Sequence, residues 1–157
     1  MNATTTRAVT LLGLLLVLGT ANYAIWGKER IIRNGETIYL DLAPVDPRSL
    51  MQGDYMALRF RLATSIETAR SESSSERSAP LTLDERRVAT LDSTGNGALR
   101  IAYRIRSGHV WLGTNAFFFA EGTADRYAAA RYGEFKLDRA SGEAVLVGLR
   151  DENLKAL

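Results

Sequence analysis

Hydrophobic and more polar side chains alternate along three stretches of this chain. In residues 37–42 the apolar side chains Ile38, Leu40 and Leu42 occupy every second position. Residues 55–62 and 99–106 have the same period of two. Successive side chains of a strand point to opposite faces, so the pattern predicts strands with one buried and one hydrated face. Shorter strands are predicted at residues 110–112, 116–120, 134–137 and 144–149.

Polar and glycine-rich segments separate these strands. Residues 93–97 lie between residues 87–91 and 99–106 and predict a hairpin. Residues 138–142 join the last two strands in the same way. Residues 71–80 are polar and of low complexity, which predicts a mobile loop.

One segment between the strands has a helical pattern. Thr123 is a candidate N-cap, alanines fill the middle of residues 123–131, and Gly133 stands where a C-terminal glycine belongs. We expect this helix to pack on one sheet face. The expected fold is mainly β (α+β), a β-sandwich or open barrel with one short helix.

The N-terminus carries the longest apolar run. Residues 8–26 contain no charged side chain, and a helix of this length would rise about 28 Å, close to the thickness of a bilayer's hydrocarbon core. Tyr23 and Trp26 fall where aromatic side chains mark the membrane interface. We predict a transmembrane anchor here, between a short tail of residues 1–7 and a β-rich domain of residues 27–157.

A cleaved signal peptide is the alternative interpretation of the same run. Its apolar core would be residues 8–19, and residues 19–21 would be a small-residue cleavage site. Cleavage after Ala21 would release a soluble periplasmic domain.

The composition and the net charge of the chain exclude several classes of function. The 157 residues include 20 basic and 18 acidic side chains, a formal net charge of +2 and no cysteine. The near balance gives no electrostatic footprint for nucleic acid. The lack of cysteine excludes a disulfide framework, thiol catalysis and thiolate metal sites.

The charges that flank the apolar run bear on the orientation of the chain in the membrane. Lys28, Arg30 and Arg33 follow it and Arg7 precedes it, which by the positive-inside rule favours a cytoplasmic domain. A short tail followed by a large hydrophilic domain fits export equally well.

The segment of residues 43–55 is the densest in residues with special backbone preferences. Asp46 can cap a helical turn that begins with Pro47, and Gly53 can end that turn before the strand at Tyr55. Asp54 is expected to accept hydrogen bonds from nearby backbone N–H groups. This interpretation makes the segment a rigid junction, and a catalytic role for it is the alternative.

Residues 53–60, Gly-Asp-Tyr-Met-Ala-Leu-Arg-Phe, resemble the motif that names the GDYXXLXY family of bacterial proteins. The lead-in at residues 42–50 and the segments 117–122, 130–134 and 146–150 are similar to that family as well. The motif residues here are Gly53, Asp54, Tyr55, Leu58 and Phe60, and Phe60 replaces the final Tyr. The resemblance implies a membrane segment and the company of polytopic membrane proteins, and it implies no reaction.

A hydrolase is the alternative function class. Ser49 upstream of the motif is faintly similar to the nucleophile of serine–lysine signal-processing peptidases, which need a neutral lysine in an apolar pocket. The candidates are Lys28, Lys136 and Lys155, and Lys136 alternates with apolar neighbours and should point outward. His109 alone makes a poor metal or triad residue. No cofactor, metal or catalytic residue is therefore predicted.

Arginines gather at alternate positions of two predicted strands. Arg59 and Arg61 share one strand face, and Arg100, Arg104 and Arg106 share another. If those strands are neighbours, the arginines form a basic face for anionic lipid headgroups or an acidic partner segment. The alternative is an ordinary hydrated face paired with Glu and Asp.

Three consecutive phenylalanines form the second candidate interaction feature. In a strand, Phe117 and Phe119 point one way and Phe118 the other, so either the helix at residues 123–131 covers one face or an aromatic face meets a partner. A Glu121–Arg131 ion pair is expected to hold that helix to the sheet.

Together these features favour a non-enzymatic accessory module. We expect a single span in the bacterial inner membrane, a periplasmic domain, and a polytopic membrane protein as partner. Aromatic and arginine side chains are typical of interface hot spots, and an anchor raises the local concentration of the domain.

Overall fold

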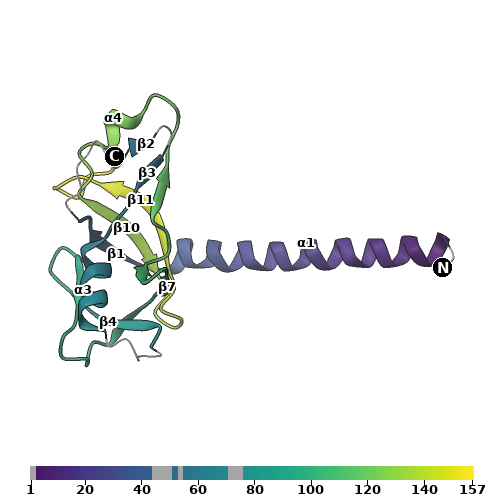
Figure 1. The fold of residues 1–157 in the computed structure, drawn as a ribbon, viewed down its shortest axis with the longest axis horizontal. Coiled ribbons are helices and arrows are strands. Elements are labelled where there is room, and N and C mark those ends of the chain that lie inside the picture. The colour runs from purple at the N-terminus through teal and green to yellow at the C-terminus, as the bar shows by residue number, and fades with distance from the viewer. Residues whose placement is uncertain (1–2, 44–50, 53–54, 71–75) are drawn as a thin grey trace.

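A computed structural model describes residues 3–43, 51–52, 55–70 and 76–157 (Figure 1). A long N-terminal helix projects from a domain of short strands. The elements in chain order are α1 (Ala3–Asn34), β1 (Glu36–Asp41), β2 (Met51–Gln52), β3 (Tyr55–Ala57), α3 (Arg61–Ala69), β4 (Ser78–Leu83), β5 (Ala89–Leu91), β6 (Leu99–Ala102), β7 (Arg104–Arg106), β8 (His109–Trp111), β9 (Ala116–Phe118), α4 (Ala124–Tyr127), β10 (Tyr132–Leu137) and β11 (Ala144–Arg150).

The strands form several small antiparallel sheets. Their orders are β1-β10-β11, β2-β3-β9, β5-β4-β6 and β7-β8. The described strands do not close into a barrel. This arrangement confirms the mainly β class with a long apolar N-terminal helix, although the described part of the domain includes two helices, α3 and α4, where the sequence predicts one.

The sheet β1-β10-β11 supplies the centre of the core. The strands β1 and β10 alternate buried and half-buried positions as the sequence pattern predicts. The side chains of Ile38, Leu40, Phe135, Leu137 and Leu149 are almost completely buried. The turn at residues 138–142 joins β10 to β11, which confirms the second predicted hairpin. Within this turn the Ser141 hydroxyl donates to Asp138 and lowers the pKa of that carboxyl.

The prediction of a single strand over residues 55–62 is wrong, because the end of this segment belongs to helix α3. The strand β3 ends at Ala57, and Arg61 begins a helix of nine residues. The alternate side chains Met56, Leu58 and Phe60 are all buried, so the period of two reports burial correctly but misses where the backbone turns. Leu62 and Ile66, four residues apart, form the buried stripe of the helix.

The strand β4 shows that two further predictions are wrong, the extent of the mobile loop and the first hairpin. Ser78–Pro80 belong to this strand and not to a mobile loop, whereas residues 71–75 lie outside the described residues. The strand lies between β5 and β6, so residues 87–91 and 99–106 are not direct hairpin partners. Pro80 hides the strand in the sequence because proline rarely occupies a central strand. Its neighbours Ala79 and Leu81 are nevertheless buried.

Two predicted elements are shorter in the structure. The strand at residues 99–106 breaks at Tyr103, whose backbone N–H donates to the carbonyl of Arg77 and whose hydroxyl donates to Glu76. The helix predicted at residues 123–131 is only Ala124–Tyr127. The Thr123 hydroxyl donates back to Ala120 instead of capping the helix, and the Arg131 N–H is already bonded to Arg150 of β11.

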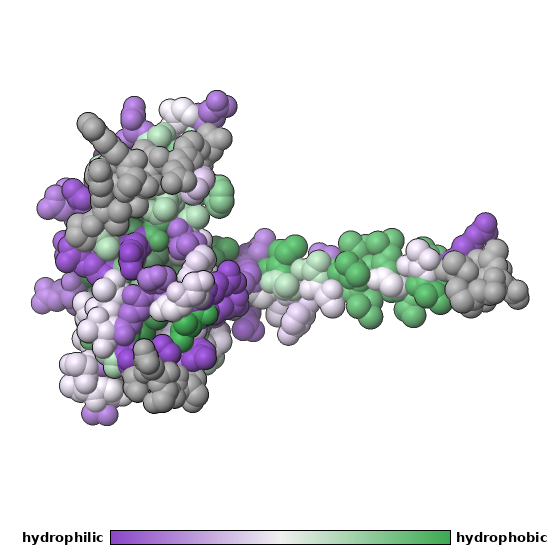
Figure 2. Space-filling model, in the orientation of Figure 1, coloured by the Kyte–Doolittle hydropathy of each residue, from purple (hydrophilic) through white to green (hydrophobic). Residues whose placement is uncertain are grey.

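Helix α1 runs past the predicted anchor boundary at residue 26 and enters the domain. Residues 9–34 are long and apolar enough to cross a membrane, and Figure 2 shows hydrophobic residues along the projecting helix. Near its C-terminal end Ile31 is buried, and Lys28 forms an ion pair with Glu143, which immediately precedes β11. The residue after the helix must be a glycine, because a Cβ at Gly35 would lie 2.4 Å from the Ile31 carbonyl oxygen. No flexible linker therefore separates helix and domain.

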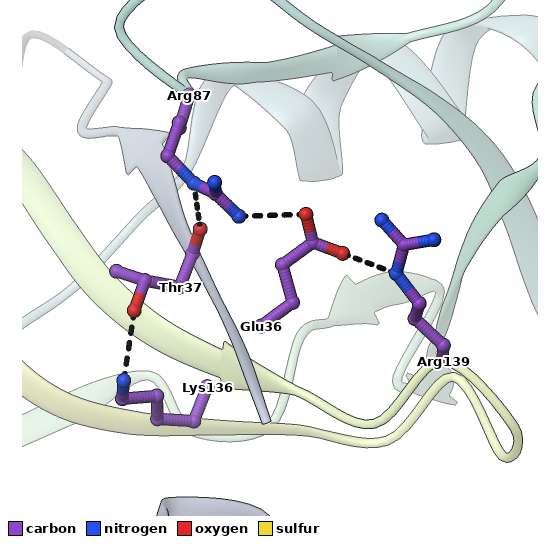
Figure 3. Close-up of polar contacts among 5 residues, drawn as sticks. All are labelled: Glu36, Thr37, Arg87, Lys136 and Arg139. Carbon is purple, nitrogen blue, oxygen red and sulfur yellow. Dashed lines mark hydrogen bonds and ion pairs between the residues drawn. The ribbon is translucent and has the colours of Figure 1, made fainter. Parts of the chain in front are cut away.

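A polar cluster fixes the first strand beside this joint (Figure 3). The Glu36 carboxylate accepts hydrogen bonds from Arg87 at 2.6 Å and from Arg139 at 2.5 Å. Arg87 also donates to the Thr37 carbonyl, and Lys136 donates to the Thr37 hydroxyl at 2.8 Å. Glu36 therefore links the start of β1 to two loops that lie far away in the sequence.

The first prediction concerns the core around Gly133. A Cβ there would lie 2.8 Å from Phe60, 3.0 Å from Phe135 and 3.1 Å from Leu146. We expect Gly133→Ala to lower the free energy of unfolding by about 1–3 kcal/mol through overpacking. Denaturant unfolding of the full chain in non-ionic detergent measures it.

The matched control is Gly148→Ala, where the nearest atom would be 3.9 Å away, and the change should stay within about 0.5 kcal/mol. Adding Phe60→Leu to Gly133→Ala should cost less than the sum of the single changes. Additive losses would contradict the packing described here.

The second prediction concerns Glu36. The hydrogen bond from Arg139, helped by the charges of Arg139 and Arg87, outweighs burial and lowers the pKa of Glu36 below 4.5. A carboxyl with a lowered folded-state pKa stabilises the fold above its unfolded-state value and loses that contribution as the pH falls. At pH 7 Glu36→Gln should cost about 1 kcal/mol, since both guanidinium groups are largely exposed.

The same unfolding measurement, repeated as the pH is lowered, tests the sign. The difference between wild type and Glu36→Gln should shrink below pH 4.5. The control Glu85→Gln removes an exposed carboxylate and should leave the pH dependence unchanged. A difference that stays constant from pH 7 to pH 3 would refute the role assigned to Glu36.

Candidate functional site

The second half of the motif forms one wall of a surface hollow. The hollow has a volume of about 340 Å³. Leu58 and Phe60 contribute to this wall, and both side chains are buried. Helix α3 and the strand β8 supply the opposite side. The lining residues are Ala57, Leu58, Arg59, Phe60, Ala63, Glu67, His109, Val110, Trp111, Leu112, Thr114 and Asn115.

Glu67 and His109 are the polar pair of this motif hollow. The Glu67 carboxylate accepts a hydrogen bond from the Val110 backbone N–H at 2.7 Å and lies 3.5 Å from His109 Nδ1. The pair therefore ties α3 to β8. Sequence reasoning missed Glu67, and the signal available was its place beside Ile66 in the amphipathic segment after the motif.

The described lining residues of the motif hollow include no serine or lysine for nucleophilic chemistry. The Thr114 hydroxyl, which belongs to the described lining, donates to the Ala116 carbonyl at 3.0 Å. Among the described residues, no three His, Asp or Glu side chains come together as metal ligands.

The three lysines considered for a serine–lysine enzyme lie apart. Lys28 forms an ion pair with Glu143, and Lys155 is exposed near the C-terminus. Lys136 points away from the core, as predicted, and donates to Thr37. None of the three is buried, whereas a general-base lysine needs an apolar pocket. The proposed nucleophile Ser49 lies outside the described residues.

The first half of the motif segment is only partly described. Asp46, Pro47, Gly53 and Asp54 lie outside the described residues, so their predicted junction remains a prediction. Tyr55 is half-buried in β3 and pairs with Phe118 of β9, with ring centroids 5.7 Å apart.

Phe60 is a packing residue. Its ring meets Phe135 edge-on, with centroids 5.2 Å apart, at the core of the domain. Only 3% of its surface is exposed. A phenylalanine in place of the motif's tyrosine therefore suits an apolar position where a hydroxyl would need a partner.

The three phenylalanines divide as the sequence predicts. Phe117 and Phe119 are half-buried, and each ring lies 5.2 Å from the ring of Tyr127 in α4. Phe118 points the other way, is 74% exposed and contacts Tyr55. Since β9 is an edge strand of its sheet, Phe118 and Tyr55 form an aromatic edge on the surface.

The five arginines do not form the single basic face considered from the sequence. Arg59 lies between β3 and α3, and Arg61 begins α3 and pairs with Asp41 at 2.8 Å. Arg100 on β6 bonds to Glu76 and Ser78. Because the strand breaks at Tyr103, Arg104 and Arg106 belong to the separate sheet β7-β8.

The structure does not form the expected Glu121–Arg131 pair. Both residues are exposed, and no ion pair joins them within the described chain. Backbone bonds hold Arg131 instead, because its N–H donates to Arg150 and its carbonyl accepts from Leu42. The helix α4 is attached to the sheet by Tyr127.

Comparison with known proteins identifies the family of this chain. The searches of curated proteins and of solved structures found no match. Residues 17–149 match the family described as GDYXXLXY protein. This match spans the end of the apolar run, the motif and the strands of the domain. It covers most of the chain, which therefore belongs to the GDYXXLXY protein family.

Proposed function

We propose that this chain is an accessory module held at the membrane surface by one helix, where its domain binds an integral membrane protein. The continuity of α1 carries the proposal. An apolar stretch long enough to cross a bilayer continues as the same helix into the domain, where Ile31 is buried and Lys28 pairs with Glu143. A domain attached in this way stays close to any partner in the same membrane.

The aromatic edge of Tyr55 and Phe118 is the proposed docking surface. An exposed phenylalanine on an edge strand offers apolar area to a partner, and an edge strand is a place where a partner's strand can add. The motif hollow of about 340 Å³ offers a second place for an apolar side chain of the same partner. The partner proposed is a polytopic membrane protein, and the domain is proposed to face the periplasm of a bacterium.

Anchoring is tested by extracting membranes with alkaline carbonate. The full chain should stay in the membrane pellet with its N-terminal sequence intact. Leu15→Arg should release part of it, because a charge at the centre of a span opposes insertion by about 2.5–3.5 kcal/mol. A chain that begins at Asn22 and is recovered in the soluble fraction would replace the anchor with a cleaved signal.

Orientation is tested with a single introduced cysteine, since the chain has none. Ser93→Cys places a thiol in an exposed loop. A membrane-impermeant maleimide should label it in intact spheroplasts to the same extent as after permeabilisation. Labelling that requires permeabilisation would place the domain in the cytoplasm.

Partner binding is tested by a photo-crosslinking amino acid at position 118 in intact membranes. The expected product is one adduct that contains a polytopic membrane protein. The matched position is Thr90, which is exposed on β5 in a different sheet and should give no such adduct. Failure at position 118, or the same adduct from position 90, would argue against the aromatic edge.

A further inference from the structure

A second hollow, of about 910 Å³, lies where α1 enters the domain. Lys28 of α1, Arg77, and Arg104 and Arg106 of β7 all line it, together with Trp111 and Glu143. Figure 1 shows β7 beside the base of α1, and Figure 2 shows hydrophilic residues at this joint. We call it the basic hollow.

Positive charge dominates the basic hollow. Among the described lining residues, four basic side chains face one carboxylate, Glu143, which is already paired with Lys28. Arg104 and Arg106 are exposed, and neither forms an ion pair with a described acidic residue. The Arg106 guanidinium lies 5.0 Å from the centre of the Trp111 ring, which orients its fork.

The position of the basic hollow matches the level of lipid headgroups. Lys28 follows Trp26 by two residues on a continuous helix, a rise of about 3 Å. Tyr23 and Trp26 are exposed aromatic side chains at the end of the apolar run, where such residues sit at the membrane interface. A hollow that includes Lys28 therefore opens beside the headgroups of the surrounding bilayer.

We propose that the basic hollow binds the phosphate headgroup of an anionic phospholipid in the membrane that anchors the chain. Guanidinium groups match the oxygens of a phosphate diester, and the Trp111 ring offers an apolar surface to the glycerol. The acyl chains of the same lipid can lie along the apolar side chains of α1. An acidic peptide would gain nothing from that apolar continuation, so a lipid is favoured.

This inference rests on the membrane anchor of the proposed function and not on its protein partner. The test uses the full chain in nanodiscs, so the fate of the N-terminus in cells and the result at Phe118 do not affect it. The chain has two tryptophans, and Trp26→Phe leaves Trp111 as the fluorescent probe. The nanodiscs contain phosphatidylcholine with an increasing fraction of phosphatidylglycerol, which makes their surface increasingly anionic.

Trp111 emission should change with the phosphatidylglycerol fraction and level off. Arg77→Gln with Arg104→Gln should reduce the initial slope about 25-fold, since each basic residue near an anionic surface contributes about fivefold. Both side chains are exposed, and circular dichroism checks that the fold is kept. The charge-matched control, Arg126→Gln with Arg131→Gln, removes exposed arginines outside the basic hollow and should respond as the unmodified chain does.

Three results would overturn the proposal. Trp111 emission that ignores phosphatidylglycerol would exclude the lipid. An equal loss of the initial slope in both double variants would show that the net charge of the chain attracts the anionic lipid, and not the basic hollow. The same emission change from inorganic phosphate with pure phosphatidylcholine nanodiscs would assign the hollow to a soluble oxoanion.

Discussion

The attachment of α1 to the central sheet is the constraint on which the rest of the molecule depends. Ile31 is buried beneath the domain, Gly35 lets the chain leave the helix tightly, and Glu36 then starts β1 between two arginines. These contacts occupy six consecutive residues, so the direction of the helix and the position of the sheet are set together. The basic hollow exists because that joint brings Lys28 to the strand pair β7-β8.

The motif contacts the central sheet at a different place from α1. Phe60 packs on Phe135 of the same central sheet, and Leu58 is buried beside it. Residues 58–60 also carry the chain from β3 into α3, whose Glu67 holds β8. The described part of the motif therefore stabilises the turn between two elements. Of the described motif residues Tyr55, Leu58 and Phe60, Tyr55 is the one that reaches the surface, at the aromatic edge with Phe118.

Local pattern and tertiary contact explain which features the sequence could predict. The turn at residues 138–142 and the opposite directions of Phe117 and Phe118 follow from neighbouring residues, and both were predictable. Helix α3 was not, because its buried stripe continues an alternation that already predicts a strand. The pairing of Glu67 with His109 and of Lys28 with Glu143 joins residues far apart in sequence. No local pattern encodes either contact.

Hydrogen exchange of the backbone amides at residues 27–34, in the full chain in nanodiscs, tests the central claim most directly. If α1 is one rigid helix from the bilayer to the domain, these amides exchange slowly, as the intrahelical bonds and the buried Ile31 require. Fast exchange throughout residues 27–34, beside a protected domain, would mean a flexible tether and would contradict the account of both the joint and the basic hollow.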